Sequence, residues 1–163
     1  GGGDGADVRV QVYDLGPAFV GMNVVCKAIG TGAFHAGVEV YGQEYSFCPC
    51  PCGPHATGIF AVNPRGCTGH VFRESLDMGR TKLSRSEVCR ILDQLMREWH
   101  FSLYDLLRRN CCHFTAEFCK RLGVRELPQW VTSLAGVGAM LRSGMRLGAR
   151  PVADSADGRA PPK

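Results

Sequence analysis

The chain has 163 residues, enough for one domain with a buried core, and its 45% hydrophobic and 21% charged residues are typical of a soluble globular protein. The 19 basic and 15 acidic residues give a net charge of +4. Basic residues are dispersed before position 142 and do not alternate with aromatic ones, which argues against a nucleic-acid-binding protein. No apolar run is long enough to span a membrane.

The first half of the chain has the pattern of β-strands. Residues 1–7 are rich in glycine and predict a flexible leader. Apolar and polar residues then alternate in short runs, which indicates strands with one buried face. These runs are residues 8–13, 34–40, 44–47, 59–62 and 70–76. Glycine-punctuated residues 15–32 predict loops, and residues 48–58, with three prolines and three cysteines, predict a surface loop.

Helical periodicity replaces the alternation after residue 83. Ser84 with Glu87 predicts a capping box, followed by an apolar stripe from Val88 to Trp99. A second helix is predicted from Asn110 to Gly123, with Phe114, Phe118 and Leu122 facing the core. A third is predicted over residues 129–141. Strands followed by helices indicate an α+β fold, a small antiparallel sheet packed with helices over residues 8–141, and residues 142–163 predict a disordered tail.

The nine cysteines do not follow the spacing of a disulfide framework, and no secretory segment leads the chain. We therefore expect reduced thiols and a cytoplasmic or nuclear location. The run Cys48-Pro49-Cys50-Pro51-Cys52, with His55 and Cys67 nearby, suggests a metal site. Paired zinc ligands usually have two or more residues between them, so we expect an unliganded loop, no metal and no cofactor.

One thiol lies where an irregular segment is predicted to become a helix. Cys111 follows Asn110, and the first turn of a helix carries partial positive charge from unpaired N–H groups. That charge lowers the pKa of a thiol and makes its thiolate available to attack an electrophile. Cys111 is therefore a candidate nucleophile, and a cysteine hydrolase would also need a base and oxyanion donors.

Histidine is the expected base, since its side chain titrates near neutral pH. His35 opens a predicted strand next to small residues that leave room for a substrate backbone. His113 is two positions from Cys111, a helical spacing that directs it away from that thiol. The others lie in or near loops or connections: His55, His70 and His100. The pattern favours His35 and leaves the other histidines open.

Four segments in this order resemble the PPPDE family of papain-like isopeptidases, whose members include the desumoylating isopeptidases. They are Val10-Gln11-Val12-Tyr13-Asp14-Leu15, Phe34-His35-Ala36-Gly37-Val38-Glu39-Val40-Tyr41-Gly42, Tyr104-Asp105-Leu106-Leu107 running into Asn110-Cys111-Cys112-His113-Phe114, and Leu127-Pro128-Gln129-Trp130-Val131. The resemblance extends across roughly residues 8–141, which is most of the chain. It implies a permuted papain-like cysteine peptidase fold in which the catalytic histidine precedes the cysteine.

By this resemblance, His35 and Cys111 take the positions of the family's catalytic pair. The family usually has asparagine after the cysteine, where this chain has Cys112. If the helix register were shifted by one residue, Cys112 would compete as nucleophile. The backbone N–H of Cys111 is the expected oxyanion donor, and the Asn110 side chain is a candidate for a further one. No third residue that orients His35 is evident, and Asp14 and Glu39 are candidates by residue type alone.

The leading hypothesis is a cysteine isopeptidase that removes ubiquitin or a ubiquitin-like modifier such as SUMO from lysine side chains through a Cys111–His35 dyad. One alternative is an S-acyl thioesterase acting on palmitoylated proteins, because a thioester is more reactive than an amide. Another is an inactive domain that binds a modifier. The expected partners are modifier conjugates, with no nucleic acid and no membrane insertion. The oligomeric state and the preferred modifier are left open.

Overall fold

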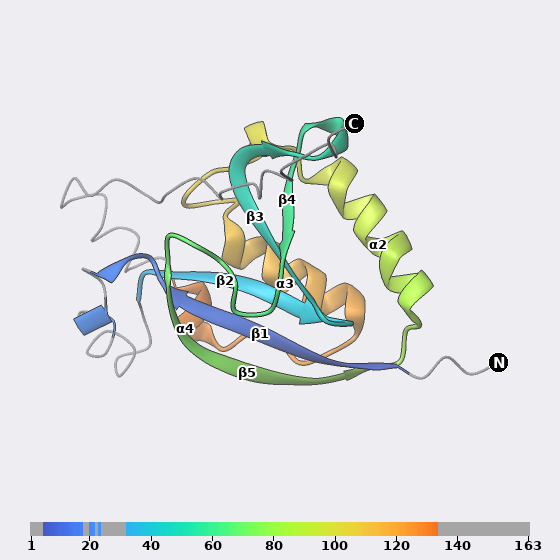
Figure 1. The fold of residues 1–163 in the computed structure, drawn as a ribbon, viewed down its shortest axis with the longest axis horizontal. Coiled ribbons are helices and arrows are strands. Elements are labelled where there is room, and N and C mark those ends of the chain that lie inside the picture. Colours follow the sequence, from blue (N-terminus) through green and yellow to red (C-terminus); the bar gives the residue numbers. More distant parts are fainter. Residues whose placement is uncertain (1–4, 18–19, 22, 24–31, 134–163) are drawn as a thin grey trace, which may run out of the picture.

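A computed structural model describes residues 5–17, 20, 21, 23 and 32–133, which form one five-stranded sheet packed with helices (Figure 1). The strands lie in the order β4-β3-β2-β1-β5, and every neighbouring pair is antiparallel. Their bounds are β1 Ala6–Asp14, β2 Phe34–Val40, β3 Gln43–Cys52, β4 Thr57–Val62 and β5 Val71–Thr81. The α+β class and the small antiparallel sheet predicted from the sequence are confirmed.

The helices follow the strands in the chain. They are α2 Arg85–Glu98, α3 Cys111–Leu122 and the short α4 Gln129–Thr132, with single 3-10 turns at η2 Pro54–Ala56 and η3 Phe101–Leu103. Ser84 and Glu87 form the predicted capping box of α2. Gly123 ends α3 in the left-handed conformation, with a φ of 69° that favours glycine. Most of the predicted third helix and the whole predicted tail, residues 142–163, lie outside the described residues.

Two element predictions are corrected by the structure. β1 begins at Ala6, so the last residues of the predicted leader belong to the sheet. The predicted loop over residues 48–58 is wrong at its start, because β3 continues to Cys52. Pairing between β3 and β4 stops after Phe47 and resumes at Cys52. Pro49 and Pro51 lie in this interruption, where the missing N–H of proline costs no ladder hydrogen bond.

The core lies between the sheet and α3, and an aromatic cluster joins it to the end of α2. The residues predicted to face inward from α3 are buried: Phe114, Phe118 and Leu122. Phe47 of β3 lies 5.0 Å from Trp99, and Trp99 lies 5.5 Å from Phe114, measured between ring centroids. Such edge-to-face contacts add to the free energy gained by burying the rings. They fix the first turn of α3 against the sheet.

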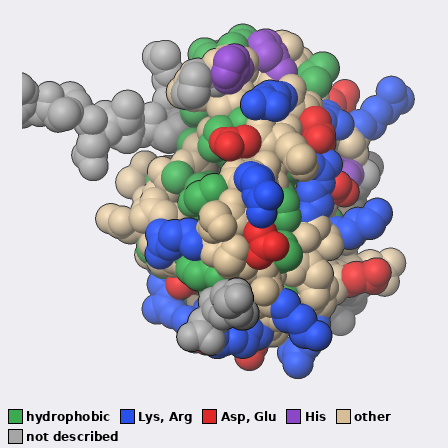
Figure 2. All heavy atoms as spheres, turned by 90° about the vertical axis from the view of Figure 1, so that its right-hand side faces the viewer, with side chains coloured by type: hydrophobic (Ala, Val, Ile, Leu, Met, Phe, Trp, Pro, Cys, Tyr) green, Lys and Arg blue, Asp and Glu red, His purple; other side chains and the backbone are tan. Residues whose placement is uncertain are grey.

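On the face that is seen from the right-hand side of Figure 1, positively and negatively charged side chains are intermixed. Figure 2 shows that Lys and Arg side chains lie among Asp and Glu side chains there. In the described part of the chain, Arg121 of α3 forms ion pairs with Glu98 of α2 and with Glu117, one turn earlier in α3. Exposed pairs of this kind contribute about 1 kcal/mol or less each.

Candidate active site

The site forms where two neighbouring strands separate. β2 and β3 pair only between Val38–Val40 and Gln43–Tyr45, next to their connecting turn. Beyond this point the backbone of Ala36 bonds to side chains instead of to a strand. Its carbonyl accepts hydrogen bonds from Ser46 of β3 at 2.8 Å and Thr115 of α3 at 3.2 Å. Its N–H donates to the Cys111 sulfur. The opening between β2 and β3 therefore admits the amino-terminal end of α3.

Cys111 is the first residue of α3, as the sequence predicted, and its side chain is buried. Asn110 precedes the helix in an extended conformation. Its side-chain oxygen accepts hydrogen bonds from the N–H groups of Cys112 at 2.9 Å and His113 at 3.1 Å. In return, His113 Nδ1 accepts from the Asn110 N–H at 3.1 Å. This reciprocal cap positions the Cys111 sulfur at the positive end of the helix dipole.

The Cys111 thiol and the His35 ring are brought together, although they are far apart in the sequence. His35 lies on β2 and is only 5% exposed. Burial by itself lowers the pKa of His35, but the charge of Cys111 and hydrogen bonds to Cys111 and Cys67 raise that pKa to about 10. The same pairing helps to lower the pKa of Cys111 well below its ordinary value of 9.0. The favoured state at neutral pH is a thiolate–imidazolium pair.

Cys112 has a different environment from its neighbour. Its thiol donates its single hydrogen to the carbonyl oxygen of Phe34, which lies 3.7 Å from the sulfur. The interaction with the Cys112 side chain is the largest cause of the lowered pKa of Cys111. The same interaction, together with burial, raises the pKa of Cys112 well above 9.0. Cys112 is therefore a neutral thiol that supports the Cys111 thiolate.

Ser46 contacts the far side of the His35 ring, a role that the sequence did not indicate. Its hydroxyl lies 3.0 Å from His35 Nε2 and donates its single hydrogen to the carbonyl of Ala36. Nε2 must then carry a hydrogen and donate it to Ser46, because a hydroxyl has only one hydrogen to give. Ser46 is fully buried. This arrangement fixes the orientation of the ring and leaves Nδ1 for a thiol.

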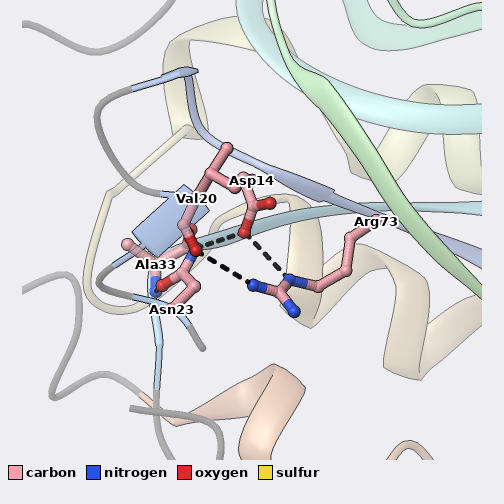
Figure 3. Close-up of polar contacts among 5 residues, drawn as sticks. All are labelled: Asp14, Val20, Asn23, Ala33 and Arg73. Carbon is pink, nitrogen blue, oxygen red and sulfur yellow. Dashed lines mark hydrogen bonds and ion pairs between the residues drawn. The ribbon is translucent and has the colours of Figure 1, made fainter. Parts of the chain in front are cut away.

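Asp14 and Glu39 do not take the orienting role for which they were candidates by residue type. Asp14 Oδ1 accepts from Asn23 at 2.6 Å and pairs with Arg73 at 3.0 Å (Figure 3). Asn23 also bonds the backbone N–H and carbonyl of Ala33, each at 2.9 Å. These contacts hold the chain just before β2. Glu39 accepts a hydrogen bond from Gln11.

Glu44 is a fully buried acidic residue close to His35. It accepts hydrogen bonds from the Tyr13 hydroxyl at 2.8 Å and from the Arg65 N–H at 2.8 Å. Glu44 also lies close enough to His35 for the charges of the two side chains to interact. A Cβ on Gly37 would lie 2.6 Å from Glu44 Oε1. Glycine at position 37 is therefore what allows this carboxylate to fit beneath β2.

Tyr104 is a second side chain that the sequence did not single out, although it lies within one of the quoted motifs. Its hydroxyl contacts both the sulfur and the backbone N–H of Cys111. Burial raises the pKa of Tyr104, and the neighbouring charges of Cys111 and Cys112 raise it further. Tyr104 therefore keeps its hydrogen and is a neutral donor beside the nucleophilic sulfur.

The remaining histidines fall into two groups. His70 packs against His35 with ring centroids 4.6 Å apart, so it belongs to the site. Burial and the charge of His35 lower the pKa of His70 to about 4, which makes it a neutral ring at pH 7. His113 caps α3 and His100 caps η3, as their backbone hydrogen bonds show. His55 is exposed in the η2 turn.

Asn110 serves as a helix cap, and its side-chain nitrogen donates to the Leu106 carbonyl at 2.9 Å. We expect Asn110→Ala to lower the free energy of unfolding by about 1 kcal/mol, as measured by urea denaturation. Asn110→Ser retains a capping oxygen and should keep both stability and turnover. A large fall in turnover for Asn110→Ser at unchanged stability would instead assign the amide to the oxyanion.

The chain is similar in sequence to known proteins over most of its length. The family model described as "PPPDE putative peptidase domain" matches residues 6–148. The chain is 37% identical over 135 residues to the DeSI-like protein At4g17486 of Arabidopsis thaliana, covering 81% of this chain and 56% of that protein.

Two further relatives are similar over the same length. The Desumoylating isopeptidase 1 homolog of Caenorhabditis elegans is 32% identical over 134 residues, covering 80% of this chain and 38% of that protein. The DeSI-like protein sdu1 of Schizosaccharomyces pombe is 33% identical over 135 residues, covering 80% and 65%. The chain spans less than two thirds of the length of each of these three relatives.

Proposed function

We propose that this chain is a cysteine isopeptidase that removes a ubiquitin-like modifier from lysine side chains. The chain belongs to the PPPDE peptidase family and therefore has a papain-like fold. The observation that carries the proposal is the buried pair of the Cys111 thiol, at the first turn of α3, and the His35 ring. The pKa of Cys111 is lowered and that of His35 is raised to about 10, so both groups are charged at neutral pH. That pair is an activated nucleophile beside a proton donor.

The proposed reaction is acyl transfer in two steps. The Cys111 thiolate attacks the isopeptide carbonyl carbon, and the carbonyl electron pair moves to oxygen. When the intermediate collapses, the bond from carbon to the lysine nitrogen breaks and His35 gives its proton to the leaving amine. In the second step neutral His35 takes a proton from water. The hydroxide attacks the thioester carbonyl carbon, and the bond from that carbon to the Cys111 sulfur breaks. The modifier leaves as a carboxylic acid that gives its proton to solvent, and the Cys111 thiolate and the His35 imidazolium are regenerated.

The oxyanion of the intermediate needs donors beside the sulfur. The backbone N–H of Cys111 and the hydroxyl of Tyr104 both lie there. In the free protein they bond to each other, and the incoming carbonyl oxygen would displace that contact. Preorganised donors of this kind contribute about 3 kcal/mol each to transition-state stabilisation. The proposal therefore gives the oxyanion role to Cys111 and Tyr104, and the capping role to Asn110.

Ser46 is proposed as a positioning residue for His35. We expect Ser46→Ala to lower kcat/KM by about tenfold to a hundredfold, because a hydrogen bond to a charged group contributes about 1.5–3 kcal/mol. It should also move the alkaline limb of the pH–rate profile to lower pH, since Ser46 stabilises the imidazolium.

The matched control is Ser46→Thr, which keeps the hydroxyl and should restore most of the activity and the position of the alkaline limb. A purely structural serine would lower activity through stability alone. In that case the alkaline limb would stay where it is in the wild-type protein, and the positioning role would be wrong.

SUMO is the modifier that we propose first. One relative is named a desumoylating isopeptidase 1 homolog, and two others are named DeSI-like. The assay compares SUMO and ubiquitin joined to a peptide lysine by an isopeptide bond. Cleavage of the SUMO conjugate with at least about tenfold higher kcat/KM, roughly 1.4 kcal/mol, would support this choice. Faster cleavage of ubiquitin would overturn the modifier but not the reaction.

The same assay tests the alternatives. A fatty-acyl thioester cleaved while both isopeptides stay intact would make the protein an S-acyl thioesterase. Binding of a modifier without cleavage of any substrate would make it a binding domain. Either result would overturn the isopeptidase proposal.

The proposed location is cytoplasmic or nuclear. The cysteines in the described part of the chain are free thiols, which supports a reducing compartment. Cys48 and Cys52 are free thiols whose sulfur atoms share a hydrogen bond at 3.5 Å. Among the described residues, no helix combines the length and apolar character needed to cross a membrane.

A further inference from the structure

Two potential metal ligands lie next to His35 and have no part in the proposed reaction. Cys67 lies in the connection between β4 and β5, and His70 directly precedes β5. Ligand atoms of His35, Cys67 and His70 all lie within 4.8 Å of one another. His35 and Cys67 are buried, and His70 is half-buried. Two separate segments, β2 and the connection between β4 and β5, therefore place two imidazoles and a thiol around one point.

Oxygen atoms hold both imidazoles in the way that metal-binding histidines are usually held. His35 Nε2 bonds to the Ser46 hydroxyl at 3.0 Å, and His70 Nδ1 lies 3.3 Å from the carbonyl oxygen of Leu15. In each ring one nitrogen is engaged by an oxygen and the other remains for a ligand or thiol. Such supporting bonds orient metal-binding histidines and fix their tautomers.

The donor set selects the kind of ion. Two imidazole nitrogens and one thiolate suit zinc, whereas magnesium and calcium prefer oxygen ligands. Three protein ligands leave the fourth tetrahedral position of zinc open, and no second cysteine or carboxylate belongs to the cluster in the described residues.

Small movements would complete the site. Ligand atoms at most 4.8 Å apart surround a centre roughly 2.8 Å away, whereas zinc binds nitrogen at about 2.0 Å and sulfur at about 2.3 Å. Each ligand would move by roughly 0.5–0.8 Å. The rings of His35 and His70 are stacked at 20°, so the half-buried His70 ring must also turn until its nitrogen points at the ion.

We propose that His35, Cys67 and His70 form a zinc-binding site and that its occupation inhibits the hydrolase. Binding releases two protons to solvent, one from the Cys67 thiol and one from the His35 imidazolium, and uses the freed His35 nitrogen as a neutral ligand. His35 then has no proton to give to the leaving amine, and Cys111 loses its cationic partner. The inhibition rests on the proposed function, whereas metal binding does not.

Metal binding is tested on the full chain by titration with Co²⁺, which gives visible absorption and thiolate-to-metal charge transfer in such sites, followed by competition with Zn²⁺. We expect one ion per chain in the wild-type protein. Cys67→Ala should remove the charge-transfer band, and His70→Phe, which keeps a ring against His35, should weaken binding by about tenfold or more. Cys52→Ser controls for the Cys48–Cys52 thiol pair and should bind as the wild type does.

Inhibition is a separate measurement on the same variants. Zn²⁺ should inhibit the wild type and be reversed by a chelator. Measured against its own activity without metal, His70→Phe should need about tenfold more Zn²⁺ for half inhibition than the wild type does. Spectra that do not depend on Cys67 or His70 would overturn the site. Equal inhibition of wild type and His70→Phe would overturn the regulation. An inactive protein that still binds Co²⁺ through Cys67 would contradict the proposed function and support the site.

Discussion

Cys111→Ser is expected to reduce kcat/KM for an isopeptide substrate by roughly 10⁴-fold or more, the scale seen when a nucleophile of a catalytic unit is removed. A serine hydroxyl at this position would not be ionised at neutral pH, so it could not form the charged pair with His35. The measurement is turnover of a modifier–lysine conjugate in the presence of a chelator. Circular dichroism of both proteins establishes that the variant is folded.

Cys112→Ser is the matched control for this variant. Its hydroxyl can still donate to the Phe34 carbonyl and keeps a polar group at position 112, whose interaction with Cys111 is the largest cause of the lowered pKa of Cys111. We expect activity to stay within about tenfold of wild type, the equivalent of roughly 1.4 kcal/mol. Full loss of turnover in Cys112→Ser, with activity retained in Cys111→Ser, would assign the nucleophile to Cys112 and would sink the dyad proposed above.

His35→Gln is expected to lower kcat by about 10²–10⁴-fold, the usual contribution of a general acid–base group. The amide keeps polar atoms near Ser46 but cannot carry a proton to the leaving amine. It also removes the positive charge that helps to lower the pKa of Cys111. The pH dependence of alkylation by iodoacetamide should therefore shift to higher pH in the variant. An unshifted alkylation profile would contradict the ion pair.

The pH–rate profile of the wild-type protein follows from the same two groups. Activity requires the Cys111 thiolate and the His35 imidazolium. As pH falls, activity is lost through the lowered pKa of Cys111, below its ordinary value of 9.0. As pH rises, activity is lost through the pKa of His35 near 10. The neutral range should be a plateau, and an alkaline limb near the ordinary histidine pKa of about 6.5 would contradict the pairing.

Physical signals in the sequence predicted the fold and the position of Cys111 at the start of a helix, whereas the choice of His35 among the histidines came from the family resemblance. The period-two alternation of apolar residues predicted the strands β1 and β2, although most residues on both faces of these strands are buried. The Ser84 capping box specifies the start of α2 locally. Asn110 likewise specifies where α3 begins. Cys111 is therefore in the first turn of the helix, at the positive end of the helix dipole. Local signals of this kind are readable without tertiary structure.

The rest of the site depends on contacts between distant segments. Ser46 reaches His35 only because β2 and β3 are unpaired before Val38 of β2 and after Tyr45 of β3, and no local pattern marks that opening. Tyr104 contacts Cys111 through the connection that precedes α3. Cys67 was grouped by proximity in sequence with the cysteines of β3, but the fold places it beside His35 and His70. The sequence did not predict the proline-containing end of β3, because the pairing between β3 and β4 is interrupted there.

The most direct test of the nucleophile and its substrate class is to identify the residue that reacts with a modifier whose carboxyl terminus carries an electrophile. The protein is labelled with SUMO and ubiquitin probes of this kind, digested, and the adduct mapped by mass spectrometry. We predict a single adduct on the sulfur of Cys111, formed faster with SUMO and strongly slowed by His35→Gln. An adduct on Cys67 or Cys112, or no adduct with either probe from a folded protein, would contradict the account.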